Sequence, residues 1–453
     1  MGFTSGRLIL VIWTMLALNT PVLSSPSRTR TAESGLKKLR ILWQSDPVLL
    51  IEKHRRPVDE AIRYDLIDAH ALGTPAATRQ SVAGLSAYLT QPACNEFEKV
   101  RAVYRWITAN IDYDVESYFK TRNHSPDAGH PLRSGKAVCA GYSGLFTELL
   151  QHCGIQCMEI SGYAKGYSYE TGELPAGSNH SWNAVSIEGR WYLIDPTWGS
   201  GYIDSERCFK RQFEDFYFCP PPELLIMTHL PDEPRYQFID PPLTSAEFVQ
   251  LAKPWPIFFK QGFHQCVSLE SLLEADSLLI YRFRTSQPTS ILADLTRDGQ
   301  KLSKTQTFIQ TENGFHTVYV RFPATGTYLF ELFARPLSDT DAYQIAMKCQ
   351  IQTRNSCRTI HPFPITYPSF TPSMRLHTPL RGQLPANTIC DFRVTVPEVA
   401  SVAVYNADHW HHLIAQADTW YGSVRVIRGE LHVMIKYHPG DTAYWRILTW
   451  QVQ

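Results

Sequence analysis

A cysteine, a histidine and an aspartate follow one another in the middle of the chain, each in a local sequence that suits cysteine chemistry. A nucleophilic thiol needs a base that takes its proton and a third group that orients the base. The order and setting of Cys139, His180 and Asp195 match these three roles. We therefore expect Cys139 to be a nucleophile, His180 its base and Asp195 the residue that orients the base.

Cys139 is predicted to lie in the first turn of a helix of about four turns. Apolar residues recur after it at helical spacing, and Gly154 supplies a stop signal. The unpaired N–H groups of a helix N-terminus favour the thiolate, which is the nucleophilic form. The small residues Ala140 and Gly141 would leave room for a substrate backbone. The alternative is a small buried cysteine, which is what most lone cysteines are. The apolar positions of the expected helix are Leu145, Phe146, Leu149, Leu150 and Cys153.

His180 and Asp195 are expected on two strands of one hairpin. The segment that begins at His180 alternates in polarity, and a Glu-Gly pair then turns the chain into a second strand that ends at Asp195. If Ile187 pairs with Arg190, Trp182 lies opposite Asp195, and His180 lies diagonal to Asp195 on the same face. That offset is about 7 Å between backbones, within reach of a His–carboxylate hydrogen bond. A histidine on a strand is more often a core residue, but this placement downstream of a helix-starting cysteine is seldom accidental.

Three sequence blocks carry a family resemblance. Val-Cys-Ala-Gly-Tyr-Ser at 138–143, Ser-Asn-His-Ser-Trp-Asn-Ala-Val at 178–185 and Leu-Ile-Asp-Pro-Thr-Trp-Gly at 193–199 resemble the active-site blocks of the transglutaminase-like superfamily. Within it, the chain is most similar to the kyphoscoliosis peptidase (hillarin-like) family, over roughly residues 64–260. The blocks are specific as a set, and all three catalytic positions match. The resemblance implies a papain-like, transglutaminase-like fold with the same triad roles.

Tyr113 follows a predicted helix, and in the family the corresponding tyrosine lies near the active site. Its hydroxyl would help to hold a developing oxyanion beside the Cys139 backbone N–H. A core tyrosine with a hydrogen-bonded tip is an equally good interpretation of the sequence.

The resemblance implies acyl transfer from a protein or peptide amide through a thioester on Cys139. Attack by water would make the enzyme a peptidase or deamidase, whereas attack by a protein amine would make it a cross-linking transglutaminase. The family name favours hydrolysis, and so does the lack of an acidic cluster resembling a calcium site. A third alternative is a non-catalytic scaffold that uses this domain for binding.

Composition excludes some partners. The 453 residues include 43 acidic and 43 basic ones, so net charge gives no argument for binding nucleic acid or an anionic membrane. We expect no cofactor, because no Gly-rich phosphate loop occurs, and no resident metal, because no Cys-x-x-Cys pair occurs. The His-rich run 408–412 invites a metal interpretation, but its spacing alone is weak support, and a solvated loop is favoured.

The first 24 residues are typical of a secretory signal peptide. Arg7 precedes the apolar run 8–18, and small residues end at Ser24. We therefore expect a secreted or extracellular protein, with the cytoplasm as the alternative that the family resemblance favours. The ten cysteines do not decide the compartment, because a free catalytic Cys139 leaves an odd number for pairing.

The expected fold class is α+β, with a catalytic domain followed by two β-sandwich domains. After the signal peptide, we expect a flexible lead-in at 25–45, the catalytic domain at 46–252, and sandwiches at 253–355 and 356–453. In the first sandwich, Asn313-Gly314 is a hairpin-type turn. Besides the protein or peptide substrate, cytoskeletal or matrix proteins are the partners expected at the sandwiches.

Overall fold

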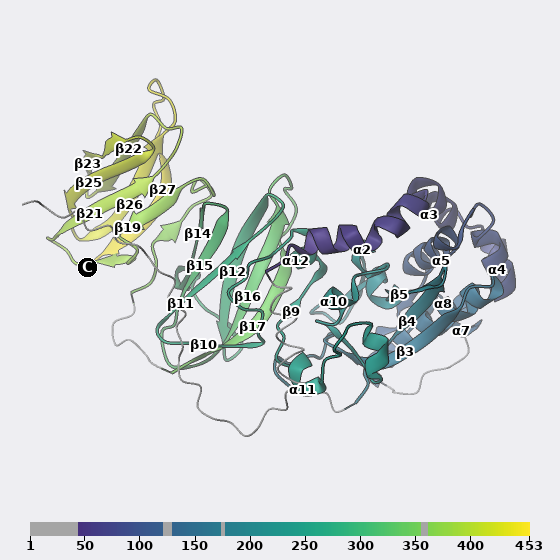
Figure 1. The fold of residues 1–453 in the computed structure, drawn as a ribbon. Helices are drawn as coiled ribbons and strands as arrows, with labels where there is room; N and C mark the ends of the chain where they lie inside the picture. The colour runs from purple at the N-terminus through teal and green to yellow at the C-terminus, as the bar shows by residue number, and fades with distance from the viewer. Residues whose placement is uncertain (1–43, 121–128, 174–176, 355–360) are drawn as a thin grey trace, which may run out of the picture.

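The computed structural model describes residues 44–120, 129–173, 177–354 and 361–453. The helical and sheet-containing N-terminal unit lies at one end of an elongated molecule, and two β-sandwiches follow it in chain order (Figure 1). The α+β fold class, with β-sandwiches after the N-terminal unit, is confirmed. Residues 1–43 lie outside the described part, so the signal peptide and most of the lead-in stay predictions.

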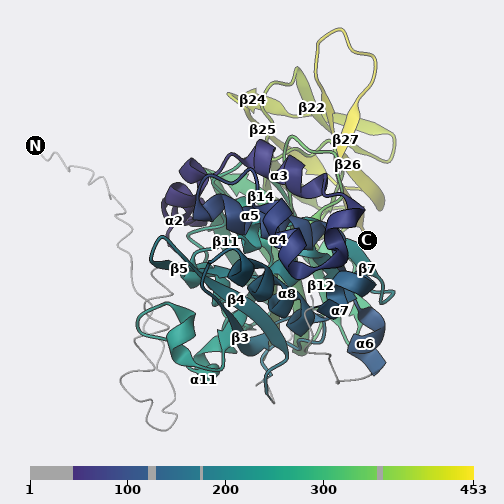
Figure 2. The same cartoon turned by 90° about the vertical axis from the view of Figure 1, so that its right-hand side faces the viewer.

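The N-terminal unit packs helices against one face of a four-stranded antiparallel sheet with the order β5-β4-β3-β8 (Figure 2). The sheet strands are β3 (Cys157–Ala164), β4 (His180–Ile187), β5 (Arg190–Ile194) and β8 (His229–Pro231). Two short pairs accompany it, β1 (Asp112–Tyr113) with β2 (Lys136–Ala137) and β6 (Gly201–Ile203) with β7 (Phe209–Arg211). The helices are α2 (Pro47–Ala61), α3 (Tyr64–Leu72), η1 (Ala76–Gln80), α4 (Val82–Leu89), α5 (Glu96–Asn110), α6 (Val115–Lys120), α7 (Gly129–Ser134), α8 (Cys139–His152), α9 (Pro196–Ser200), η2 (Asp215–Tyr217), α10 (Pro222–Leu225), η3 (Pro234–Gln237), α11 (Ser245–Phe248) and α12 (Pro256–Lys260).

The two faces of the sheet are buried in two different hydrophobic clusters. Val185 and Ile187 of β4 face the helices, in a cluster that includes α5 and α8. Trp182 and Ala184 of the same strand face the opposite cluster. Because successive side chains of a strand point to opposite faces, a sheet covered on both sides must be apolar on both. This double burial fixes β4 and the residues at its start.

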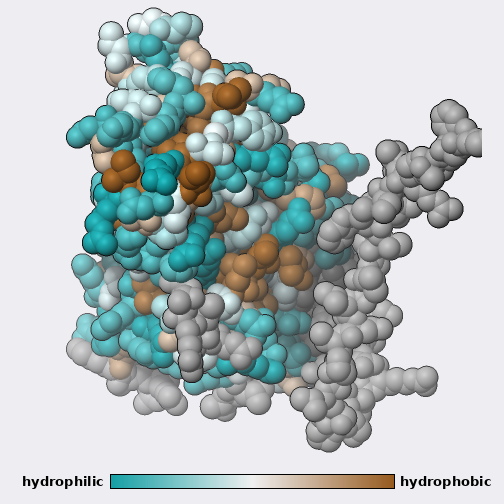
Figure 3. All heavy atoms as spheres, turned by 90° about the vertical axis from the view of Figure 1, so that its left-hand side faces the viewer, coloured by the Kyte–Doolittle hydropathy of each residue, from teal (hydrophilic) through white to brown (hydrophobic). Residues whose placement is uncertain are grey.

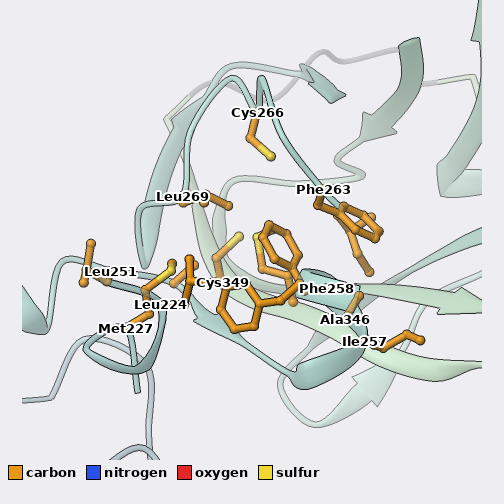
Figure 4. Packing of buried hydrophobic residues seen from close by; sticks show 14 of the residues in the cluster. Leu224, Met227, Leu251, Ile257, Phe258, Phe263, Cys266, Leu269, Ala346 and Cys349 are labelled. Carbon is orange, nitrogen blue, oxygen red and sulfur yellow. The ribbon is translucent and has the colours of Figure 1, made fainter. Parts of the chain in front are cut away.

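The first sandwich shares a core with the N-terminal unit. Leu224, Met227 and Leu251 lie in one cluster with Phe258 and with Cys349 of the sandwich (Figure 4). β9 also pairs with β17 across the junction. The proline-rich junction is therefore packed on both sides. The strands are β9 (Lys253–Pro254), β10 (Leu272–Ala275), β11 (Leu278–Arg284), β12 (Thr289–Arg297), β13 (Gln300–Lys301), β14 (Thr307–Glu312), β15 (Phe315–Arg321), β16 (Gly326–Pro336) and β17 (Gln344–Thr353), with η4 (Lys304–Gln306) between β13 and β14.

The hairpin between β14 and β15 forms at the expected Asn-Gly turn. Glu312 pairs with Phe315, and Asn313 and Gly314 both have positive φ, at 50° and 74°. A type I′ turn requires positive φ at both central residues, which is why Asn-Gly is favoured there.

The second sandwich has a largely separate core. Its sheets have the orders β18-β27-β26-β22-β23 and β19-β21-β25-β24. Seen from this end, the surface is mostly hydrophilic, with separate small apolar patches (Figure 3), as is normal for a protein surface. The strands are β18 (Ile365–Thr366), β19 (Arg375–Thr378), β20 (Gln383–Leu384), β21 (Ile389–Thr395), β22 (Ser401–Asn406), β23 (His409–His412), β24 (Ile414–Gln416), β25 (Thr419–Arg425), β26 (Gly429–Lys436) and β27 (Trp445–Val452).

Four of the five residues of the His-rich run 408–412 form strand β23 (His409–His412), where a loop was expected. Strand alternation separates His411 from His412, so neighbouring imidazoles point to opposite faces.

Among the helices of the described residues, none combines the length and apolarity needed to cross a bilayer. The nine described cysteines are all free thiols.

Candidate active site

Cys139 is the first residue of α8, as the helical spacing predicts. Strand β2 pairs with β1 and leads directly into the helix, which fixes where the helix begins. The N-cap residue Val138 makes no side-chain hydrogen bond, so the first N–H groups of α8 are free of a side-chain cap. The Cys139 sulfur therefore lies at the positive end of the helix. Only 9% of the residue is exposed.

Gly141 serves packing rather than substrate entry. A Cβ atom at this position would lie 2.8 Å from the Ala137 side chain and 3.2 Å from Pro131. The residue thus faces the interior of the domain, because α7 and the chain before α8 approach the helix closely. The expectation that Gly141 leaves room for a substrate backbone was wrong.

His180 is the first residue of β4, and its side chain is only 7% exposed. Ile187 pairs with Arg190, so the register of the hairpin is the one inferred from the alternating pattern. His180 Nε2 lies 2.8 Å from Asp195 Oδ2. Trp198 lies beside the imidazole, with ring centroids 5.5 Å apart. Since Nε2 binds Asp195, Nδ1 is the ring nitrogen left for the hydrogen bond between His180 and the Cys139 thiol.

Asp195 is fully buried and accepts four hydrogen bonds. It is the N-cap of α9, and its Oδ1 accepts from the backbone N–H groups of Thr197 at 2.8 Å and Trp198 at 3.0 Å. Its Oδ2 faces His180 and a second histidine, His229, at 3.0 Å. Burial raises the pKa of the Asp195 carboxyl, but the charge and hydrogen bonds of the two histidines outweigh burial and hold the pKa well below its usual range.

His229 is the residue that the sequence analysis missed. It begins β8, and burial lowers the pKa of its imidazole against the opposing effect of Asp195. An ionised carboxylate can only accept hydrogen bonds. Nε2 of the neutral His229 ring therefore carries the proton and donates a hydrogen bond to Asp195. His229 Nδ1 then accepts from the Thr228 hydroxyl, 2.8 Å away. No local pattern marks His229, because it reaches Asp195 only through the pairing of β8 with β3.

Cys139 and His180 stabilise each other's charged forms. Burial raises the pKa of the Cys139 thiol, but the hydrogen bond and charge of His180, together with the Ser181 backbone N–H, bring the pKa below its ordinary value. Burial lowers the pKa of His180, but Asp195 and Cys139 raise it to about 10. The two groups therefore form a thiolate–imidazolium pair more readily than an isolated cysteine and histidine would, with an ionised Asp195 behind them.

Tyr113 lies beside the nucleophile. It pairs with Ala137, two residues before Cys139, in the contact between β1 and β2. Burial raises the pKa of the Tyr113 hydroxyl, and the Cys139 charge raises it further, so the group stays a neutral donor. The side chain is thus placed close to the sulfur, although its ring also packs on the helical core.

His180, Asp195 and His229 form the one group within the described residues whose metal-binding atoms gather closely enough to hold an ion. Both imidazole Nε2 atoms lie 2.8 to 3.0 Å from the same carboxylate oxygen. These are hydrogen-bond distances between a donor and an acceptor. The donor set is thus satisfied internally, and these residues do not fit a metal site.

Comparison with known proteins agrees with this geometry. Residues 83–196 match the model of the transglutaminase-like superfamily, and residues 245–364 match that of the KY-like, immunoglobulin-like domain. The chain carries a transglutaminase-like core followed by a KY-like immunoglobulin-like domain. Cys139, His180 and Asp195 all lie within the match to the transglutaminase-like core, whereas His229 lies beyond its end.

Two curated relatives resemble a large part of the chain. Kyphoscoliosis peptidase of Mus musculus is 30% identical over 303 residues, which cover 63% of this chain and 43% of the relative. Hillarin of Drosophila melanogaster is 23% identical over 310 residues, which cover 62% of this chain and 37% of the relative. The chain thus matches less than half the length of either relative.

Among solved structures, part of the chain is similar to a protein whose crystal structure is described as that of a TGase. That structure is 18% identical, covers 32% of this chain and 36% of its own, and has a TM-score of 0.22.

Proposed function

We propose that this protein is a cysteine-dependent acyl transferase that hydrolyses an amide of a protein or peptide through a thioester on Cys139. The observation that supports it most is the buried Asp195–His180 hydrogen bond beside a thiol whose pKa is lowered. A buried structural cysteine would instead show a raised thiol pKa, as burial does for Cys219 and Cys266, whose pKa rises to about 12.

In the first step, the Cys139 thiolate attacks the amide carbonyl and forms a carbon–sulfur bond. The negative charge moves to the carbonyl oxygen, which accepts hydrogen bonds from the Cys139 N–H and the Tyr113 hydroxyl. His180 Nδ1–H protonates the leaving nitrogen as the carbon–nitrogen bond breaks. An amine leaves, and the acyl group stays on Cys139 as a thioester.

In the second step, a water molecule gives a proton to His180 Nδ1 and attacks the thioester. The carbon–sulfur bond breaks, a carboxylic acid leaves, and the thiolate–imidazolium pair is restored. Asp195 keeps the proton of Nε2 in place throughout, so only Nδ1 exchanges protons with the substrate. His229 holds the Asp195 oxygen that accepts this Nε2 proton.

Hydrolysis is favoured over cross-linking because the mouse and human relatives are named peptidases. Both reactions pass through the same acyl-enzyme, so the triad alone does not distinguish them. The binding of a cytoskeletal or matrix protein by the sandwiches stays a prediction.

The test incubates the protein with a glutamine-rich protein and a labelled primary amine, with Cys139→Ala as the control. Hydrolysis predicts new carboxyl groups, seen by mass spectrometry, without incorporation of the amine. Incorporation that depends on Cys139 would instead identify a cross-linking enzyme. A protein in which neither reaction occurs, and in which iodoacetamide labels Cys139 no faster than the other cysteines, would be a non-catalytic scaffold.

A further inference from the structure

Four aromatic rings run in sequence from the neighbourhood of Cys139 to the protein surface. The centroids of Tyr113 and Tyr118 lie 5.9 Å apart, those of Tyr118 and Phe119 lie 5.0 Å apart, and those of Phe119 and Tyr167 lie 5.6 Å apart. All three contacts are edge-to-face, the geometry that aromatic pairs prefer. Tyr113 lies at the inner end of this aromatic row, beside Cys139, through the pairing of β1 with β2.

The aromatic row joins two separate elements. Tyr118 and Phe119 lie on α6, whereas Tyr167 lies in the loop that follows β3. The Tyr118 hydroxyl donates to Ser168 Oγ at 3.3 Å, which ties the two elements together at the same place. The aromatic row therefore joins α6 to the loop after β3.

The outer rings are not part of the core. Phe119 is 40% exposed and Tyr167 is 46% exposed. Neither they nor Tyr118 belong to any of the three hydrophobic clusters of the described residues. The Arg207 guanidinium packs 4.7 Å from the centre of the Phe119 ring and restricts that ring. Large apolar rings that are exposed, ordered by one another and continuous with a nucleophile suit contact with a ligand.

We propose that Tyr118, Phe119 and Tyr167 form a substrate subsite that holds an aromatic or large aliphatic side chain carried by the acyl group. This inference rests on the proposed function of Cys139. Tyr113 contacts the carbonyl oxygen in that mechanism, so the side chain beside that carbonyl lies nearest to Tyr118. A small or charged side chain would leave the rings in water and lose the apolar contact.

The test uses N-acetyl p-nitrophenyl esters of phenylalanine, leucine and serine, because acylation of Cys139 is common to hydrolysis and transfer. The intact protein should prefer the phenylalanine and leucine esters by about 10- to 200-fold, the range that one apolar pocket supplies. Phe119→Ser and Tyr167→Ser should each reduce this preference to a few-fold, mainly through KM. Phe119→Leu, which keeps an apolar side chain, should retain most of it.

Leu66→Ser is the matched control, since Leu66 is 47% exposed on α3 and outside the aromatic row. It should leave the preference unchanged. The rate of Cys139 alkylation by iodoacetamide, measured in every variant, separates failure of the subsite from failure of the catalytic pair. If the intact protein shows no ester preference while Cys139 still alkylates selectively, the subsite is disproved. Faster alkylation after removal of a ring would also overturn it, because the rings would then only cover the sulfur.

Discussion

At the residue scale, the proposed chemistry depends on the different hydrogen-bond donors that face the two carboxylate oxygens of Asp195. Oδ1 accepts only backbone N–H groups at the start of α9, whereas Oδ2 accepts only imidazole N–H groups. The same side chain thus holds the local backbone and the tautomers of two histidines. The structural and catalytic roles of Asp195 can be separated by a substitution that changes only one oxygen.

Asp195→Asn should preserve the fold and remove turnover. Asparagine is as good an N-cap as aspartate, so its oxygen can keep the two backbone donors of α9. Its NH₂ group then faces His180 and forces Nε2 to accept, which leaves the proton on Nδ1. We expect kcat to fall by about 10⁴, by analogy with the serine triad, and the melting temperature to change little. Steady-state kinetics beside thermal unfolding test this, and a large loss of stability with activity retained would contradict it.

His229→Phe should weaken catalysis without abolishing it. The change removes one donor to the buried Asp195 carboxylate while keeping a ring in the same space. A hydrogen bond to a charged group is worth about 1.5 to 3 kcal/mol, so we expect kcat to fall by about 10- to 100-fold. The acid limb of the pH–rate profile should also move, because Asp195 then supports His180 less well.

His229→Gln is the matched control, since its amide N–H can replace the Nε2–H of histidine. It should recover most of the lost activity. Equal losses in the two variants would mean that His229 only fills space.

The three candidate catalytic residues could be expected from the sequence because each lies in a short local pattern. Cys139 starts an apolar period, and a tight turn fixes the register between His180 and Asp195. His229 could not be expected, since it reaches the site through Ala164 of β3, 65 residues earlier in the chain. The packing role of Gly141 could not be expected from the sequence either, because it depends on how Pro131 packs against α8.

At the element scale, buried Lys165 and half-buried Lys253 connect the loop after β3 to the segment that leads into the first sandwich. Lys165 Nζ donates to the carbonyls of Phe248 at 3.0 Å and Leu251 at 2.6 Å. In the reverse direction, Lys253 Nζ donates to the carbonyl of Gly166 at 2.9 Å. Lysines are rarely this buried, so sequence alone assigns them to the surface. This connection fixes the start of the loop that carries Tyr167.

The unfolding free energy should carry a pH dependence from Lys253. Burial, followed by the charge of Lys348, lowers the pKa of Lys253 to about 7. Between pH 7 and about 10.4 the unfolded chain binds the proton more tightly than the folded one, so this residue makes stability rise with pH. Below pH 7 both states are protonated, and the contribution is constant.

Urea unfolding at pH 7.5 and 9.5 tests this on the difference between the wild type and Lys253→Met. The comparison is necessary because His180, whose pKa is raised to about 10, makes stability fall with pH from about 6.5 upward. Replacing Lys253 should remove its positive contribution to the slope of the unfolding free energy against pH. Lys304→Met, at an exposed lysine, should leave the slope unchanged, and equal slopes in all three proteins would refute the account.

At the scale of the whole molecule, one hydrophobic core crosses from the transglutaminase-like unit into the first sandwich. The boundary expected at residue 253 predicts a change of architecture, and strands dominate after it. It could not indicate a shared core, because the residues involved are far apart in sequence. Phe248 and Phe258 flank the junction and lie in the same cluster as Phe330 of β16.

Truncation should therefore act differently at the two junctions. A chain ending at residue 252 loses the larger part of the shared core and should expose apolar surface, with lower stability and poor solubility. A chain ending at residue 354 loses only the second sandwich, whose core is largely its own, and should keep Cys139 reactive. Urea unfolding and alkylation of both chains test this, and equal stability of the two chains would contradict it.

The rate of thiol alkylation as a function of pH is the sharpest test of whether His180 activates Cys139. In the wild type, the rate should rise with a midpoint below the ordinary thiol pKa of about 8.5. In His180→Ala, burial is no longer opposed by an imidazolium, so the midpoint should move above that value. Profiles that overlap in the two proteins would mean that no Cys139–His180 pair exists.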